Sequence, residues 1–254
     1  MHDNLWRRAV VAVDQLLAPL VVFAAAYFAT LFFLVPHVQL FQWTALVAAV
    51  IATAAAVYLW DRGRWRLGFF VPPLLARREA ALGLAVAILL IGSADVLIVL
   101  TTGTRHSFRG GFPWIEIAAV FVPAVFHEEL LFRGYPFQRL WRWKPAVAVF
   151  TVSAVFAALH AGNSSVTPLG LLNVFLGGIL LSLAWIRYER LWFPIGIHLG
   201  WNLMSGPVLG YEVSGYVPAT SILGIRGGGN PLLTGGGFGV EGSLWMTVTE
   251  IVAI

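Results

Sequence analysis

The sequence contains no cysteine and few charged residues. Without cysteine, disulfide bonds, thiolate zinc sites and a cysteine nucleophile are excluded. Charged residues make up 11% of the 254 residues, compared with about 25% in soluble globular proteins. Hydrophobic residues make up 59%, so a soluble enzyme, a nucleic-acid-binding protein and a disordered chain are excluded as well.

Long apolar runs fill most of the chain. A bilayer core of about 30 Å requires about 20 apolar residues to be crossed by a helix. The runs that we predict to span are 16–35, 40–60, 80–101, 114–140, 145–160, 166–188 and 191–211. Segment 241–254 is short for a span and is expected to be a partial or interfacial helix, after a glycine-rich loop at 213–239. We therefore predict an all-α integral membrane protein, a bundle of seven to eight transmembrane helices.

The basic residues gather on one side of the predicted spans. Twelve of the sixteen lie there: Arg7, Arg8, Arg62, Arg64, Arg66, Arg77, Arg78, Arg139, Arg142, Lys144, Arg187 and Arg190. Cytoplasmic loops carry the excess of lysine and arginine, so we predict a cytoplasmic amino terminus. The excess of arginine over lysine, fifteen to one, is typical of a GC-rich bacterial genome and suggests a bacterial plasma membrane.

Ionisable residues lie inside the fourth predicted span. A charge at the bilayer centre costs about 2.5–3.5 kcal/mol on insertion scales, so a chain retains one when it is paired or used. Glu129 and Arg133 are four residues apart and are expected to form a supporting ion pair on one helix face. Glu128 is rotated by about 100° from Glu129 and has no such local partner.

Two further predicted spans carry polar residues. The fifth ends with Phe156 and His160, and the seventh contains His198 and Asn202, each pair at a spacing of four. We expect Glu128, His160, His198 and Asn202 to converge on one small polar cavity inside the membrane.

Two kinds of chemistry fit this set of side chains. A carboxylate beside a histidine can act as a general base on water, while an imidazole and an amide can stabilise an oxyanion. Alternatively, Glu128, His160 and His198 are ligand types of catalytic zinc, which activates a bound water. Both alternatives lead to hydrolysis of an acyl bond, and the residues do not choose between them.

Three spaced motifs carry a family resemblance. Glu128-Glu129-x-x-x-Arg133, Phe156-x-x-x-His160 and His198-x-x-x-Asn202 resemble the motifs of the CPBP intramembrane proteases, the type II CAAX prenyl endopeptidase or Abi family. The resemblance divides the chain into three parts. Residues 1–113 would contribute three helices, 114–240 the protease-like core, and 241–254 a short terminal helix.

The resemblance implies an endopeptidase, a hydrolase buried in the membrane. Glu128 and His160 would activate the water, and His198 and Asn202 would form the oxyanion hole. Glu129, Arg133 and Phe156 would support them. The family is often called a metalloprotease, so a divalent metal such as zinc stays an open expectation. The implied partners are the bilayer and a membrane-embedded or lipid-anchored peptide, not a nucleic acid.

Two other functions fit buried carboxylates and histidines. A proton-coupled transporter would use them as a relay, but such proteins usually show internal repeats, and none is evident here. A catalytically silent scaffold or immunity protein is the other alternative. For Asp95 and Glu116 we expect hydrogen bonds to a neighbouring helix or a place at a helix end. His127 is expected to face lipid headgroups, a neighbouring helix or water, and Asn173 to pack closely between helices or to line the cavity.

Overall fold

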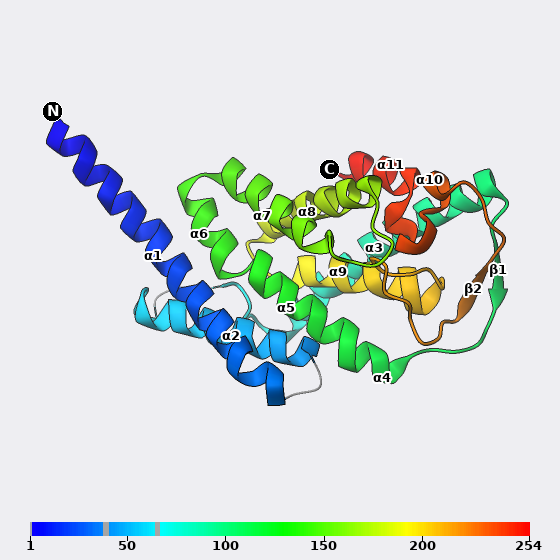
Figure 1. Cartoon of the computed structure of the whole chain (residues 1–254), viewed down its shortest axis with the longest axis horizontal. Helices are drawn as coiled ribbons and strands as arrows, with labels where there is room; N and C mark the ends of the chain where they lie inside the picture. The colour runs from blue at the N-terminus through cyan, green and yellow to red at the C-terminus, as the bar shows by residue number, and fades with distance from the viewer. Residues whose placement is uncertain (1, 38–40, 64–66) are drawn as a thin grey trace.

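The computed structural model describes residues 2–37, 41–63 and 67–254, with side chains from residue 14 onward. The described chain is mostly helical (Figure 1). Its α-helices are α1 (His2–Leu34), α2 (Phe41–Leu59), α3 (Pro73–Thr102), α4 (Trp114–Glu116), α5 (Val122–Phe132), α6 (Tyr135–Trp143), α7 (Pro145–His160), α8 (Pro168–Tyr188), α9 (Trp192–Leu203), α10 (Pro231–Thr234) and α11 (Leu244–Ala253).

Four of these helices are long and apolar enough to cross a membrane, judged by length and composition. They are Asp14–Leu34 within α1, together with α2, α3 and α8. Helices α7 and α11 are apolar but shorter. The helical character supports the prediction of an all-α membrane protein, whereas helix length does not confirm a count of seven to eight spans. Three residues used in the sequence predictions, Leu40, Arg64 and Arg66, lie outside the described residues.

The predicted single span at 114–140 is wrong, because the chain turns within it. A π-helical segment, Ile117–Phe121, leads from α4 into α5, and α5 ends at Phe132. The backbone then leaves helical geometry at Gly134, with φ −76° and ψ −136°, before α6 begins. A Cβ atom at Gly134 would lie 2.1 Å from the carbonyl oxygen of Leu130, so this turn requires glycine.

The last predicted span, 191–211, is also interrupted. Helix α9 ends at Leu203 and continues as a π-helical segment, Met204–Val208, that contains Pro207. Proline cannot donate the backbone hydrogen bond that a regular helix requires at this position, which accounts for the widened turn.

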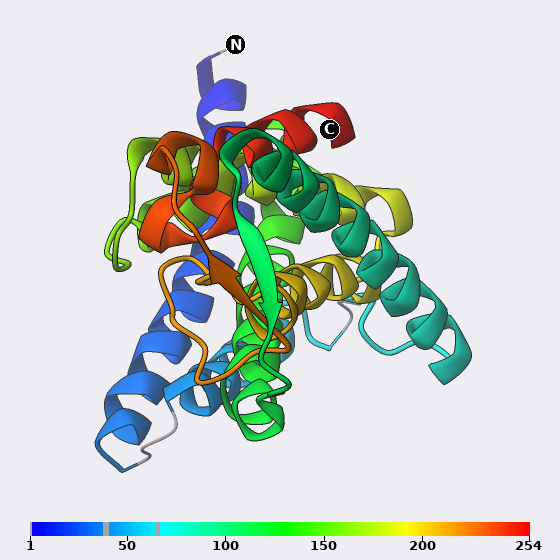
Figure 2. The same cartoon turned by 90° about the vertical axis from the view of Figure 1, so that its right-hand side faces the viewer.

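The glycine-rich stretch 213–239 is more regular than a loop. Strand β2 (Leu223–Arg226) pairs antiparallel with β1 (Arg105–Phe108), and the two lie side by side in Figure 2. The same stretch contains the short helix α10 and a 3₁₀ turn, Gly236–Phe238. The small sheet and the short helix correct the prediction of an all-α chain with only a loop here.

Helix α9 lies in the middle of the bundle and contacts α3, α5 and α8 (Figure 1). Its contact with α3 is very close, because a Cβ atom at Gly196 would lie 2.3 Å from the carbonyl oxygen of Ala80. Small residues allow such close approach between membrane helices. The polar residues of α9 are therefore held by packing on several sides.

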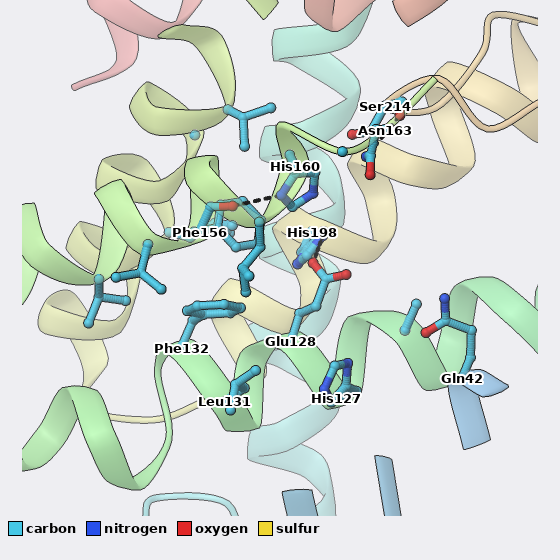
Figure 3. Close-up of a pocket in the computed structure, with 18 of the residues that line it drawn as sticks. Gln42, His127, Glu128, Leu131, Phe132, Phe156, His160, Asn163, His198 and Ser214 are labelled. Atoms are coloured by element: carbon cyan, nitrogen blue, oxygen red, sulfur yellow. Dashed lines mark hydrogen bonds and ion pairs between the residues drawn. The ribbon is translucent and has the colours of Figure 1, made fainter. Parts of the chain in front are cut away.

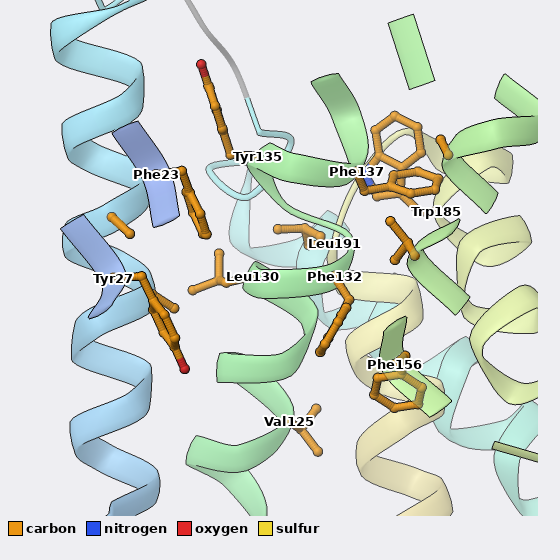
Figure 4. Packing of buried hydrophobic residues seen from close by; sticks show 14 of the residues in the cluster. Phe23, Tyr27, Val125, Leu130, Phe132, Tyr135, Phe137, Phe156, Trp185 and Leu191 are labelled. Atoms are coloured by element: carbon orange, nitrogen blue, oxygen red, sulfur yellow. The ribbon is translucent and has the colours of Figure 1, made fainter. Parts of the chain in front are cut away.

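An apolar core joins α1 to the rest of the bundle (Figure 4). The rings of Phe23 on α1 and Tyr135 on α6 are stacked with centroids 6.2 Å apart. Leu130 and Phe132 on α5 belong to the same buried cluster. The core thereby places α1 beside α5, the helix that carries the first motif.

Candidate active site

A cavity of about 1300 Å³ lies between α1, α5, α7 and α9. Glu128, His160, His198 and Asn202 all line it, and Figure 3 shows Glu128 and the two histidines close together on its wall. The cavity is not the small polar one that the sequence predicts. Most of its lining is apolar, because α1 and α7 contribute rows of aliphatic and aromatic side chains.

Glu128 faces the cavity from α5. Its side chain is 24% exposed, and its Oε2 lies 3.6 Å from Nε2 of His198. This separation is too long for a direct hydrogen bond but short enough for a strong electrostatic interaction in a poorly solvated site. A carboxylate in this position can reach both His198 and the contents of the cavity.

Glu129 holds His198 from the other side. Its Oε1 accepts a hydrogen bond from Nδ1 of His198 at 2.8 Å and another from Nη1 of Arg133 at 3.2 Å. Glu129 and Arg133 are fully buried, and their ion pair has the four-residue spacing that the sequence indicates. The contact with His198 is one that the sequence does not reveal, because it joins helices 69 residues apart.

Arg133 and Phe156 complete this support. Nη2 of Arg133 donates to the carbonyl oxygen of Gly178 at 3.0 Å, and its guanidinium lies 5.0 Å from the ring centroid of Phe156. The Phe156 ring is in turn 4.5 Å from the ring of His160 and 6.1 Å from that of His198. One buried aromatic ring therefore packs against both histidines.

His160 is the last residue of α7. Its Nδ1 lies 2.8 Å from the carbonyl oxygen of Phe156, the contact drawn as a dashed line in Figure 3. A carbonyl oxygen only accepts hydrogen bonds, so Nδ1 carries the hydrogen. In the neutral ring Nε2 then remains as an acceptor.

Sequence reasoning missed several residues that line the cavity. Tyr27 on α1 makes a 2.8 Å hydrogen bond with Nε2 of His127, which therefore contacts a neighbouring helix and also lines the cavity. Asn163 and Ser214 line it from the loops after α7 and α9, and Glu241 lines it from a short turn before α11. In the sequence these residues are recognisable only as polar side chains, and polarity alone does not indicate which of them face the cavity.

Asp95 and Glu116 do not line the cavity, and each has hydrogen-bond partners in other elements. Asp95 accepts hydrogen bonds from His106 at 2.9 Å and Tyr211 at 2.7 Å. Glu116 accepts a 2.5 Å bond from Tyr216. Burial and this bond raise the pKa of the Tyr216 phenol to about 12. Glu116 ends α4, as predicted, whereas Asp95 bonds to a residue of β1 and to Tyr211 and not to a neighbouring helix.

A metal centre needs several donor atoms that are directed at one point. Among the residues that the structure describes, no group of three or more histidine, aspartate or glutamate side chains could hold a metal ion. Zinc sites instead present several lone pairs toward one point at about 2 Å.

Residues 110–204 match the family model described as type II CAAX prenyl endopeptidase Rce1-like. The match includes all three motifs and confirms the resemblance drawn from them. It supports a protease kind of function within the membrane. Comparison with curated proteins and with solved structures found no match.

Proposed function

We propose that this protein is an intramembrane endopeptidase that hydrolyses a peptide bond of a membrane-embedded or lipid-anchored substrate. The observation that carries the proposal is the position of Glu128. Its carboxylate faces a large cavity and lies beside His198, whose orientation is set by a second, fully buried carboxylate. A base held next to a fixed donor is what the hydrolysis of an unactivated peptide bond requires.

In the proposed reaction, Glu128 removes a proton from a water molecule while the oxygen of that water attacks the scissile carbonyl carbon. The Nε2 of His160, free of the Phe156 contact, accepts a hydrogen bond from the same water and orients it. When the tetrahedral intermediate collapses, the carbon–nitrogen bond breaks and Glu128 delivers its proton to the leaving amine. All protons are then accounted for, and Glu128 returns to the carboxylate form.

The oxyanion would be stabilised by His198 and Asn202. A carboxylate on each side of the His198 ring favours a proton on both nitrogens, so that Nε2 can donate. Glu128 becomes neutral when it takes the proton from water. The negative charge that faces His198 is then on the new oxyanion. The site thereby exchanges one anion for another without adding net charge to a poorly solvated cavity.

The apolar walls of the cavity favour the binding of an apolar substrate. Phe23, Phe28 and Leu31 of α1 line one side, and Val155 and Leu159 of α7 line the other. Burial of apolar surface contributes about 25 cal/mol per Å². A transmembrane segment or a lipid chain would therefore bind beside Glu128 more favourably than a polar peptide.

The test compares wild type with Glu128→Gln in proteoliposomes, using a library of peptides that carry an apolar segment and mass spectrometry of the products. We expect cleavage to fall by at least about 1000-fold, because the general base is lost while the fold is kept. Glu189→Gln, an exposed glutamate at the end of α8, is the matched control and keeps full activity. Equal product from wild type and Glu128→Gln would reject the proposed mechanism.

The same assay addresses the metal. We propose that Glu128 acts without one, because the surrounding donors do not gather at a point. A chelator added to the wild-type protein should leave the rate unchanged, and metal analysis of the purified protein should find less than one equivalent. Loss of cleavage with chelator and its restoration by zinc would contradict this part of the proposal.

A further inference from the structure

Glu241 brings a second carboxylate to the cavity from a part of the chain beyond the family-matched segment. It lies in the 3₁₀ turn Val240–Gly242, between the glycine-rich stretch and α11. The residue is 5% exposed and lines the same cavity as Glu128 and His160. Such a buried carboxylate needs partners, and its partners indicate what it does.

On one side Glu241 is bonded to α9. Its Oε1 accepts a hydrogen bond from Nε1 of Trp201 at 2.6 Å. Trp201 directly precedes Asn202 and follows His198 by three residues on the same helix. This hydrogen bond therefore fixes the part of α9 that carries the third motif.

On the other side Glu241 is linked to the end of α7. Its Oε2 accepts a 2.5 Å bond from the hydroxyl of Ser214, and the carbonyl oxygen of Ser214 accepts a 3.0 Å bond from Nδ2 of Asn163. The backbone nitrogen of Asn163 donates to the carbonyl oxygen of His160 at 3.0 Å. Three successive hydrogen bonds thus lead from Glu241 to the residue that ends α7.

The backbone that carries Glu241 is itself fixed. Nδ2 of Asn173 on α8 donates to the carbonyl oxygens of Glu241, at 2.7 Å, and of Ser243, at 2.9 Å. Gly239, with φ 84°, lies so close to Glu212 that a Cβ atom would be 1.9 Å from its carbonyl oxygen. The turn can therefore hold the carboxylate in one place.

We propose that Glu241 is a positioning residue that sets the distance between His160 on α7 and the His198–Asn202 pair on α9. The inference rests on the proposed function, because it assigns Glu241 a role in the same site. Helices α7 and α9 each bear part of the site, and Glu241 bonds toward both. Catalysis depends on such spacing, since a displacement of about 1 Å can reduce the rate by about 100-fold.

The kinetic test uses Glu241→Ala and Glu241→Gln with a peptide that the wild type cleaves. We expect Glu241→Ala to lower kcat by about 100-fold with KM within about twofold, because alignment is lost while the apolar walls remain. Glu241→Gln keeps the size of the side chain and an acceptor for Trp201, so it should recover most of kcat. A purely structural role would not separate kcat from KM in this way.

Two further variants test the bridge. Trp201→Phe removes the donor to Glu241 and should lower kcat in the wild type, yet have little additional effect in Glu241→Ala, because both changes break the same contact. Glu189→Gln is the control. Glu189 is exposed at the end of α8 and takes no part in this bridge, so kcat should not change.

A distance measurement tests the inference without any activity. The chain has no cysteine, so spin labels can be placed at two introduced cysteines, one at the exposed Phe150 on α7 and one at the exposed Leu89 on α3, which packs along α9. We expect the distance distribution to broaden in Glu241→Ala and to stay narrow in Glu241→Gln. An unchanged distribution together with unchanged kcat in Glu241→Ala would overturn the proposal. A wild type that cleaves nothing would reject the proposed function, and the distance measurement would still decide whether Glu241 spaces the helices.

Discussion

Glu128 and Glu129 are neighbours in the chain but differ in burial and in partners. Adjacent residues on a helix point about 100° apart, so Glu128 faces the cavity and Glu129 faces His198 on α9. Glu129 is fully buried between Arg133 and His198, whereas Glu128 is in part accessible from the cavity. The two carboxylates should therefore differ in whether their loss affects stability or chemistry.

Replacing Glu129 by glutamine should destabilise the fold. The change leaves the fully buried guanidinium of Arg133 without its carboxylate, and breaking a buried ion pair in this way costs about 3–5 kcal/mol. Thermal unfolding of the purified protein in detergent, followed by circular dichroism, measures the effect. Glu128→Gln is the comparison and should unfold near the wild-type temperature. Similar unfolding of all three proteins would show that the ion pair does not support the helix packing.

The sequence predicts which motif residues share a turn of one helix, but not the contacts between helices. The spacing of four places Glu129 near Arg133, because both lie on one turn of the same helix. The bond from His198 to Glu129 and the bridge through Glu241 join segments far apart in the chain. Such contacts depend on how helices pack, and no local spacing contains that information.

At the scale of elements, hydropathy predicts where apolar helices occur but not where they turn. Helix α6 after Gly134 includes Gln138 and Arg139, but a hydropathy average over the whole of 114–140 passes over the break between α5 and α6. The break matters, because the hydroxyl of Tyr135 on α6 then donates to Asp61, just beyond α2, and Arg139 pairs with the same carboxylate. A continuous helix would carry α6 away from this partner.

Gly134→Ala should destabilise the protein by about 1–3 kcal/mol, because the added methyl group would contact the Leu130 carbonyl at 2.1 Å and force the turn open. Denaturation of the purified variant in detergent gives the free energy of unfolding. Gly92→Ala in α3 is the control, since a Cβ atom there meets nothing within 4 Å and alanine favours the helix. A stable Gly134→Ala variant would mean that α5 and α6 can be joined without glycine.

At the scale of the whole molecule, the two ends of the bundle differ in charge. The ion pair Asp61–Arg139 joins the turn after α2 to α6, and the ion pair Glu79–Arg190 joins α3 to the turn after α8. In Figure 1 the amino terminus and α6 lie at one end of the long axis, and β1 and β2 lie at the other. The basic loops predicted to be cytoplasmic therefore belong to the end away from the sheet.

This arrangement gives a direct test of orientation. The chain has no cysteine, so a single cysteine can replace the exposed Arg187 at the end of α8 or the exposed Arg109 beside β1, and each can be labelled with a membrane-impermeant maleimide. Because basic loops remain in the cytoplasm, Arg187→Cys should react only in inverted membrane vesicles and Arg109→Cys only in intact cells. Labelling after detergent treatment controls for access in both variants. The reverse pattern would place the amino terminus outside. The direction of insertion does not change the positions of Glu128, His160 and His198 within the bundle, so the chemistry of the site would be unchanged. The basic end would, however, face away from the cytoplasm, where substrates are made.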